Sequence, residues 1–213
     1  MQSIITLCDV SKAFKKLRAV DHVDLALTPG KIHGIIGRNG SGKTVLMKMI
    51  CGLYRPSGGT ITVRGKRVGV DVEIPERMGI LIETPGFLPF YSGRKNLRIL
   101  AELNGACTRA RVDEVILMVG LIPTEPKHVS KYSLGMKQRL GIAQAIMEDP
   151  DLLILDEPMN GLDNAGVRDM RELFLGLKAR GKTILLASHN REDIEALCDT
   201  VCEMDAGRLT RVR

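Results

Sequence analysis

Hydrophobic residues near the start of the chain alternate with polar ones in the period of a β-strand. The pattern predicts strands around residues 5–10, 22–28 and 59–65. Pro29 and Gly30 end the second of these, and the apolar run over residues 32–36 predicts a buried strand. We expect the three alternating segments to form an antiparallel layer beside a separate core.

The helical period governs the middle of the chain. A helix over residues 43–51 carries one apolar face and ends at Gly52, and residues 78–83 predict a further buried strand. From about residue 85 to 147 the pattern is helical. The predicted helices cover residues 93–103 after a Ser92 cap, 109–119 after a Thr108 cap, and 134–147. We interpret them as an inserted helical lobe.

Strands and helices alternate again after that lobe. The pattern predicts strands over residues 151–156 and 182–187, each followed by a helix, over residues 164–180 and 191–198. This order is typical of a parallel sheet covered by helices. The expected fold class is therefore α/β, with a mainly parallel sheet, an N-terminal antiparallel β subdomain and an inserted α-helical subdomain. We predict a single domain over residues 1–213, its core from about 1–84 and 148–213 and its helical part from about 85–147.

Composition is ordinary for a soluble protein, with 44% hydrophobic and 26% charged residues among 213. No apolar stretch approaches the roughly 18 residues that a membrane-spanning helix needs. The first residues show no basic leader followed by an apolar core, so we expect a cytosolic chain. Five scattered cysteines, without the partners of a zinc site, predict reduced packing thiols.

The formal charge of +6 raises the question of a polyanionic partner. The basic residues are spread along the chain, and three Tyr, four Phe and no Trp offer little for stacking on bases. A solvated basic surface is the expected reading, with no nucleic acid partner, although charge alone leaves a polyanion open.

A glycine-rich octapeptide follows the buried strand at residues 32–36. It reads Gly-Arg-Asn-Gly-Ser-Gly-Lys-Thr and satisfies every fixed position of the phosphate-loop pattern G-x-x-x-x-G-K-[ST]. Backbone N–H groups of such a loop face inward and meet the positive end of the following helix. We expect Lys43 to hold the β- and γ-phosphates and Thr44 to bind Mg²⁺. The predicted nucleotide-binding residues are Gly37, Arg38, Asn39, Gly40, Ser41, Gly42, Lys43 and Thr44.

Three further polar residues follow predicted strands at the edge where parallel sheets bind ligands. Asp156 and Glu157 end one strand. We expect Asp156 to hold Mg²⁺, directly or through water, and Glu157 to act as the base that orients the attacking water. His189 follows the next strand and is positioned to donate to the γ-phosphate. The catalytic candidates are thus Glu157, His189 and Lys43, and the alternative is two solvated turn carboxylates and a surface histidine.

Four further segments follow the phosphate loop in a recognisable order along the chain. They are Ser133-Leu134-Gly135-Met136-Lys137-Gln138-Arg139, Leu155-Asp156-Glu157-Pro158, Gly161-Leu162-Asp163 and Ser188-His189. With the phosphate loop, nearly the whole chain resembles the ATP-binding-cassette ATPases, which bind ATP with Mg²⁺. The resemblance implies a head-to-tail homodimer in which Ser133 and Gly135 touch the γ-phosphate held by the partner, with Asp163 at the interface. It also implies that Phe14 stacks on adenine with Ala19 nearby, where the alternative is a core phenylalanine.

Two positions depart from the usual family pattern. Leu134 stands where a second glycine is common, and Glu83 stands where the family usually has a glutamine near Mg²⁺. A carboxylate there can approach the metal and adds negative charge near the phosphates. Glu83 and its surroundings resemble the ATPase subunits of bacitracin-resistance and lantibiotic-immunity exporters.

That resemblance implies an ATPase that powers a membrane exporter, with a peptide antibiotic or similar amphipathic compound as its cargo. It further implies an integral membrane permease as partner and a place on the inner face of the cell membrane. Two alternatives remain: a soluble cassette acting on ribosomes or DNA, and a nonhydrolytic subunit. The intact set of Lys43, Asp156, Glu157 and His189 argues against the second.

Overall fold

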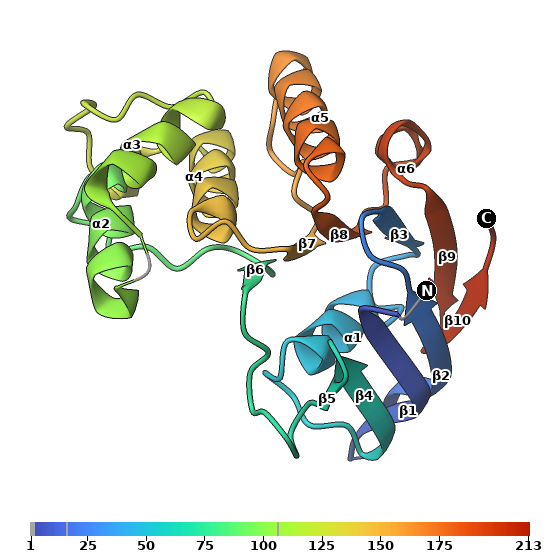
Figure 1. The fold of residues 1–213 in the computed structure, drawn as a ribbon. Coiled ribbons are helices and arrows are strands. Elements are labelled where there is room, and N and C mark those ends of the chain that lie inside the picture. The colour runs from blue at the N-terminus through green and yellow to red at the C-terminus, as the bar shows by residue number, and fades with distance from the viewer. Residues whose placement is uncertain (1–2, 16, 106) are drawn as a thin grey trace.

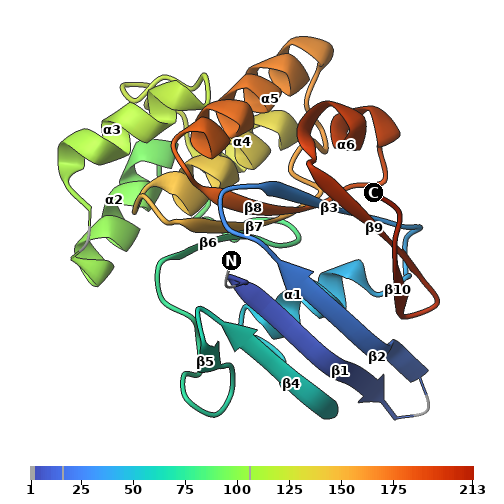
Figure 2. The ribbon, with the colours of Figure 1, turned by 45° about the vertical axis from the view of Figure 1, so that its right-hand side comes forward.

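Two β-sheets with one helix between them form the centre of the molecule (Figures 1 and 2). A computed structural model describes residues 3–15, 17–105 and 107–213. The larger sheet has six strands in the order β10-β9-β3-β8-β7-β6. All neighbours pair in parallel except β10, which is antiparallel to β9. Its strands are β3 (Ile32–Ile36), β6 (Met78–Leu81), β7 (Leu152–Asp156), β8 (Thr183–Ala187), β9 (Thr200–Asp205) and β10 (Arg208–Arg211).

The smaller sheet is antiparallel, in the order β2-β1-β4-β5. Its strands are β1 (Ile5–Phe14), β2 (Leu17–Leu27), β4 (Gly58–Val63) and β5 (Lys66–Arg67). Helix α1 (Lys43–Ile50) lies between the two sheets (Figure 2). Its residues Leu46, Met47, Met49 and Ile50 are fully buried and join both sheets in one hydrophobic cluster. This packing fixes the start of α1 at the edge of the larger sheet.

The other face of the larger sheet is covered by α5 (Asn164–Ala179) and α6 (Arg191–Leu197) (Figure 2). A lobe of α2 (Gly93–Asn104), α3 (Arg109–Met118), α4 (Leu134–Ile146) and a 3-10 turn at Val129–Lys131 stands beside it (Figure 1). Ser92 and Thr108 cap α2 and α3 as predicted, because their hydroxyls accept hydrogen bonds from backbone N–H groups three residues on. None of the helices that the structure describes is long and apolar enough to cross a membrane.

The predicted fold class is confirmed: a mainly parallel core, an antiparallel β layer and an inserted helical lobe. Two details were wrong. The first strand extends to Phe14, and the second already begins at Leu17. The two strands pair with each other beyond the residues that alternate in the sequence. The terminal strands β9 and β10 were missed. β9 is held by parallel pairing to β3, with His33 opposite Thr200, a partner far away in sequence.

Candidate functional site

The phosphate loop connects β3 to α1, and Lys43 is the first residue of that helix. The Lys43 ammonium donates hydrogen bonds to the carbonyl oxygens of Gly37, at 2.7 Å, and Arg38, at 3.2 Å, so its side chain lies across the loop. Gly42 has a φ of 111°, and a Cβ there would lie 2.3 Å from the carbonyl oxygen of Ala19. Only glycine fits this close approach of two backbones.

A cavity of about 340 Å³ opens beside the loop. It brings together most of the residues that the sequence predicted for a nucleotide. Its lining consists of Phe14, Leu17, Ala19, Asn39, Gly40, Ser41, Gly42, Lys43, Thr44, Val45, Asp156 and Glu157. The predicted residues Gly37, Arg38, Glu83, Ser133, Gly135, Asp163 and His189 are not part of this lining.

Asp156 is the buried acid of the site. Its Oδ2 accepts a hydrogen bond from the Thr44 hydroxyl at 2.5 Å, which joins the end of β7 to the first turn of α1. Burial raises the pKa of Asp156, against the hydrogen bond from Thr44. Its Oδ1 is buried and has no partner within the described part of the chain. A bound cation would satisfy this buried acceptor.

The donor set suits Mg²⁺ bound together with phosphate. Asp156 and Thr44 offer oxygen ligands, and the Ser41 hydroxyl is a further buried oxygen without a partner among the described residues. Over those same residues, no group of three or more His, Cys, Asp and Glu side chains is placed to hold a metal. Mg²⁺ at this site would therefore need oxygen ligands from a nucleotide and from water.

Glu157 and His189 contact each other at the end of the sheet. The Glu157 Oε2 lies 2.8 Å from the His189 Nδ1, and the backbone N–H of Glu157 donates to the carbonyl of Ala187. Glu157 has a φ of 49°, an unusual value for a non-glycine residue and one that is often found at functional sites. Gln138 of α4 donates to the Glu157 carbonyl at 3.0 Å, so the helical lobe contacts this residue directly.

Phe14 lies at the rim of the cavity, 40% exposed, and so is not a core residue. Its ring meets the Tyr54 ring edge to face at 5.7 Å between centroids. The Glu83 Oε1 lies 2.6 Å from the Lys48 ammonium. Neither the Tyr54 contact nor the Lys48 partner was predicted from the sequence.

Ser133, Gly135 and Asp163 lie at the starts of α4 and α5. The Ser133 hydroxyl caps α4, and the Asp163 carboxylate caps α5 by accepting from the N–H of Gly166 at 2.8 Å. A Cβ at Gly135 would lie 2.7 Å from the carbonyl oxygen of Gly161, so these two helix starts touch. Leu134 is 59% exposed between them.

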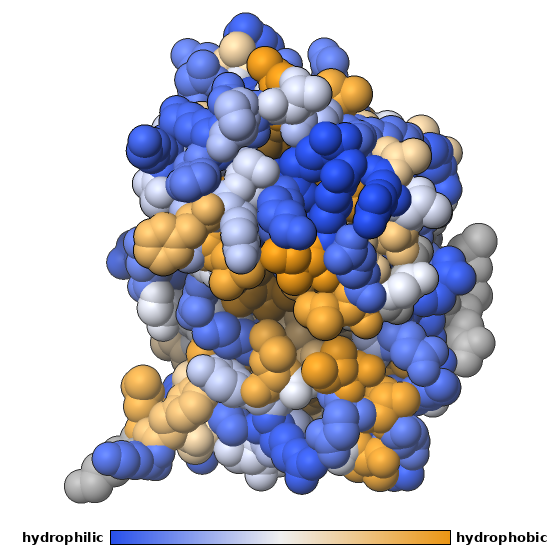
Figure 3. Space-filling model, turned by 90° about the vertical axis from the view of Figure 1, so that its left-hand side faces the viewer, coloured by the Kyte–Doolittle hydropathy of each residue, from blue (hydrophilic) through white to orange (hydrophobic). Residues whose placement is uncertain are grey.

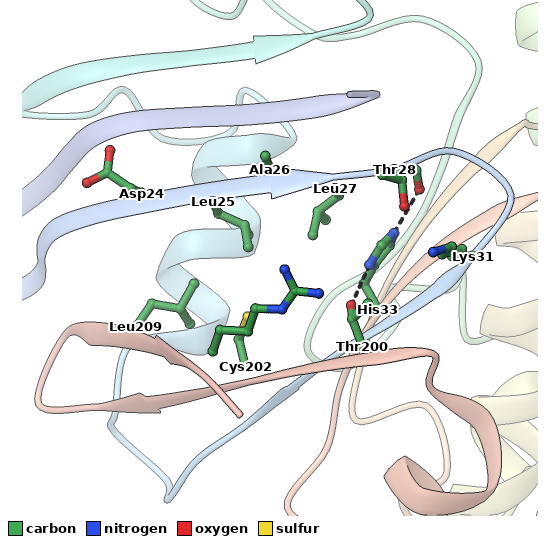
Figure 4. Close-up of a pocket in the computed structure, with 11 residues that line it drawn as sticks. Asp24, Leu25, Ala26, Leu27, Thr28, Lys31, His33, Thr200, Cys202 and Leu209 are labelled. Atoms are coloured by element: carbon green, nitrogen blue, oxygen red, sulfur yellow. Dashed lines mark hydrogen bonds between the residues drawn. The ribbon is translucent and has the colours of Figure 1, made fainter. Parts of the chain in front are cut away.

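A second cavity, of about 260 Å³, lies between β2 and the β9-β10 hairpin (Figure 4). The buried His33 forms its inner wall. Its ring nitrogens contact the Thr200 hydroxyl at 2.7 Å and the Thr28 carbonyl at 2.8 Å, as the dashed lines in Figure 4 show. Burial lowers the pKa of His33, and its two ring contacts join the end of β2 to β9.

A family model described as ABC transporter matches residues 20–160, a span that begins in the second strand and includes the phosphate loop, Asp156 and Glu157. The chain belongs to the ABC transporter family. Its cassette is 43% identical over 211 residues to the bacitracin transport ATP-binding protein BcrA of Bacillus licheniformis, covering 98% of this chain and 69% of that protein.

Solved structures agree with the fold of the cassette. One is the ATP-binding subunit of an ABC transporter, 27% identical, with a TM-score of 0.87 over 99% of this chain and 90% of the other. Another is the dimeric ATP-binding cassette MJ0796 bound to ADP and Pi, 21% identical, with a TM-score of 0.86 over 98% of this chain and 99% of the other. The chain is an ATP-binding cassette ATPase, as the sequence predicted.

Proposed function

We propose that this cassette is the ATP-hydrolysing subunit of a membrane exporter for a peptide antibiotic or a similar amphipathic compound. One observation supports ATP hydrolysis: Lys43, Thr44, Asp156 and Glu157 line the same cavity, and Thr44 is hydrogen bonded to Asp156. The export part is supported by the 43% identity to a bacitracin transport ATP-binding protein, together with Glu83 at the position discussed above.

In this proposal Lys43 binds the β- and γ-phosphates, and the loop N–H groups surround them. The bond that is broken is the terminal phosphoanhydride of ATP. Thr44 and Asp156 would hold Mg²⁺, which would offset phosphate charge. Glu157 accepts the proton of the attacking water. Because the His189 ring contacts the Glu157 carboxylate, it orients that base at the phosphate edge of the sheet.

We further propose that two copies bind two ATP molecules between them. Ser133, Gly135 and Asp163 lie outside the cavity of their own chain, on helix starts beside one another. A second copy turned head to tail would bring these N-termini to the phosphates, where a helix start favours an anion. The dimeric form of the similar MJ0796 cassette supports this arrangement.

The permease partner is proposed to dock on the side where the helical lobe meets the β layer. Apolar side chains surround a hollow on that face (Figure 3), which is the left-hand side of Figure 1. Contiguous apolar surface of this kind is a common mark of a protein interface. Docking there would place the cassette on the inner face of the cell membrane. Residues 1–213 would act as one unit, with a core from about 1–84 and 148–213 and a helical subdomain from about 85–147.

The test has two parts in the source organism. An affinity-tagged chain should be recovered from the membrane fraction together with an integral membrane protein. Deletion of its gene should sensitise cells to bacitracin or a related peptide, and the Lys43→Ala chain should fail to restore resistance. Recovery with ribosomes or DNA, and unchanged sensitivity to peptide antibiotics, would contradict the exporter assignment.

A further inference from the structure

Beside the phosphate site lies a cation that the mechanism above does not use. Lys48 is on α1, four residues after Thr44, and so lies on the same face of the helix as the predicted Mg²⁺ ligand. Its ammonium lies 2.6 Å from the Glu83 carboxylate, which follows β6. The pair joins the helix after the phosphate loop to the segment that leads into the helical lobe.

The surroundings of Lys48 hold it in this position. Its side chain is 16% exposed, and its ammonium lies 5.4 Å from the centre of the Tyr54 ring. The hydrogen bond with Glu83 is the main cause that raises the Lys48 pKa, and the charge of Asp156 adds to it. Lys48 is therefore held by Glu83 on one side and by the Tyr54 ring on another.

The Lys48–Glu83 ion pair contributes little to global stability. The Glu83 side chain is 62% exposed, and pairs exposed to solvent contribute little to the free energy of unfolding. Near bound phosphates the balance differs, because an unpaired carboxylate would add to a concentration of negative charge in a partly desolvated site. The Lys48 ammonium, which faces Glu83, is therefore important when phosphates are bound.

We propose that Lys48 is a positioning residue that fixes the Glu83 carboxylate and offsets its charge, which lets this chain carry an acid beside its Mg²⁺-ATP site. The inference rests on the ATP site proposed above and deepens it. It assigns to Lys48 a role that exists only because position 83 is glutamate. The effect of losing Lys48 must then depend on the residue at position 83.

The test is a double-mutant cycle on the purified full chain, with ATP and Mg²⁺ titrated by calorimetry. Lys48→Met should weaken ATP binding about tenfold, a coupling in the range found for residues in direct contact. In a Glu83→Gln background the same change should have no effect, so that the double variant binds ATP as tightly as Glu83→Gln alone. Lys48→Gln provides a second, polar variant with the same expectation.

The chain contains a matched control pair. Lys182 lies 2.8 Å from Asp149, with side chains 12% and 65% exposed, close to the 16% and 62% of Lys48 and Glu83. Lys182 precedes β8, at the end of the sheet opposite the site. Lys182→Met should leave the Kd for ATP unchanged, and all variants should melt within a few degrees of the parent chain.

Equal weakening by Lys48→Met in both backgrounds would show that Lys48 acts on the nucleotide or the fold directly, and would overturn the inference. An unchanged affinity for ATP after Lys48→Met in the chain that keeps Glu83 would also overturn the inference. A parent chain that binds no ATP would instead overturn the proposed function, and this inference with it.

Discussion

In the proposed mechanism, Glu157 is the residue on which ATP hydrolysis depends most, because its carboxylate acts as the base. It is only partly exposed, with 20% of its side chain accessible, and is fixed by His189 and by the backbone of β8. Glu157→Gln keeps the shape of the side chain and removes the base. We expect the rate of Mg²⁺-dependent phosphate release to fall by about 100-fold or more, as loss of a general base does, while ATP still binds.

Phosphate release and ATP affinity are measured on the same preparation. Asp169→Asn is a suitable control, since Asp169 is 58% exposed and bound to Arg139 away from the cavity. A Glu157→Gln chain that turns over at the parent rate would remove Glu157 from the mechanism.

Asp156 makes a pH-dependent prediction. Burial raises the pKa of Asp156 in the fold above its ordinary value, so the folded chain binds this proton more tightly than the unfolded chain does. Without nucleotide and Mg²⁺, its contribution to stability is fully present below the unfolded pKa and is lost as the pH rises through the folded pKa. We therefore expect Asp156→Asn to melt higher than the parent at pH 7, by roughly 2–4 °C if burial costs about 1 kcal/mol.

The advantage of Asp156→Asn should shrink as the pH falls through the folded-state pKa of Asp156 and disappear below its unfolded-state pKa, because the carboxyl is then protonated in both states. Mg²⁺-dependent hydrolysis by the variant should be lost at every pH, since a metal ligand is removed. Thermal melts across the pH range, with and without MgATP, measure both effects. Equal melting temperatures at pH 7 would contradict the desolvated state of Asp156.

The sequence predicted roles for the loop, the acids and His189 from short local patterns, and these roles stay predictions. The structure brings Lys43, Thr44, Asp156 and Glu157 to one cavity. The sequence did not identify contacts between stretches. The Glu157–His189 and Lys48–Glu83 pairs join residues 32 and 35 positions apart, and the Phe14–Tyr54 contact likewise depends on how α1 packs against the β layer. Such contacts follow from strand order and helix packing, which no local pattern specifies.

Among the elements, β6 and α4 form the closest link between the sheet and the helical lobe. A Cβ at Gly79 of β6 would lie 2.0 Å from the carbonyl oxygen of Ala145 on α4. Gly79→Ala should force the two apart and lower the free energy of unfolding by about 1–3 kcal/mol, the usual cost of overpacking. Urea denaturation measures the change.

Gly176 gives the matched comparison for Gly79. It lies in α5, is exposed, and has nothing within 4 Å of an added Cβ. Gly176→Ala should stabilise the chain by about 0.5–1 kcal/mol through helix propensity. If both variants had the same effect, the close approach of β6 and α4 would not be what Gly79 provides.

The elements themselves were largely predictable where a period was long and its ends were marked. Ser92 and Thr108 marked helix starts through their capping hydroxyls, and both bonds are present. The β9-β10 hairpin was missed because its place in the sheet depends on the parallel pairing of β9 with β3, which is far away in sequence. Its short alternating sequence carries no comparable local signal, so tertiary pairing decides its structure.

For the whole molecule, the expected fold and family are both confirmed, since the order of motifs along the chain defines an ABC cassette. The pairing of cassettes stays a prediction. Its physical basis is the division of the proposed site: the cavity beside the phosphate loop lies on one surface, and the capped starts of α4 and α5 lie outside it.

The most direct test is the mass of the Glu157→Gln chain in solution, measured by light scattering with saturating ATP and Mg²⁺. We expect twice the mass of one chain, a return to one chain when ATP is replaced by ADP, and no doubling when Lys43→Ala is added. A mass of one chain under saturating ATP and Mg²⁺, with ATP binding shown in the same sample, would contradict a shared site between two copies.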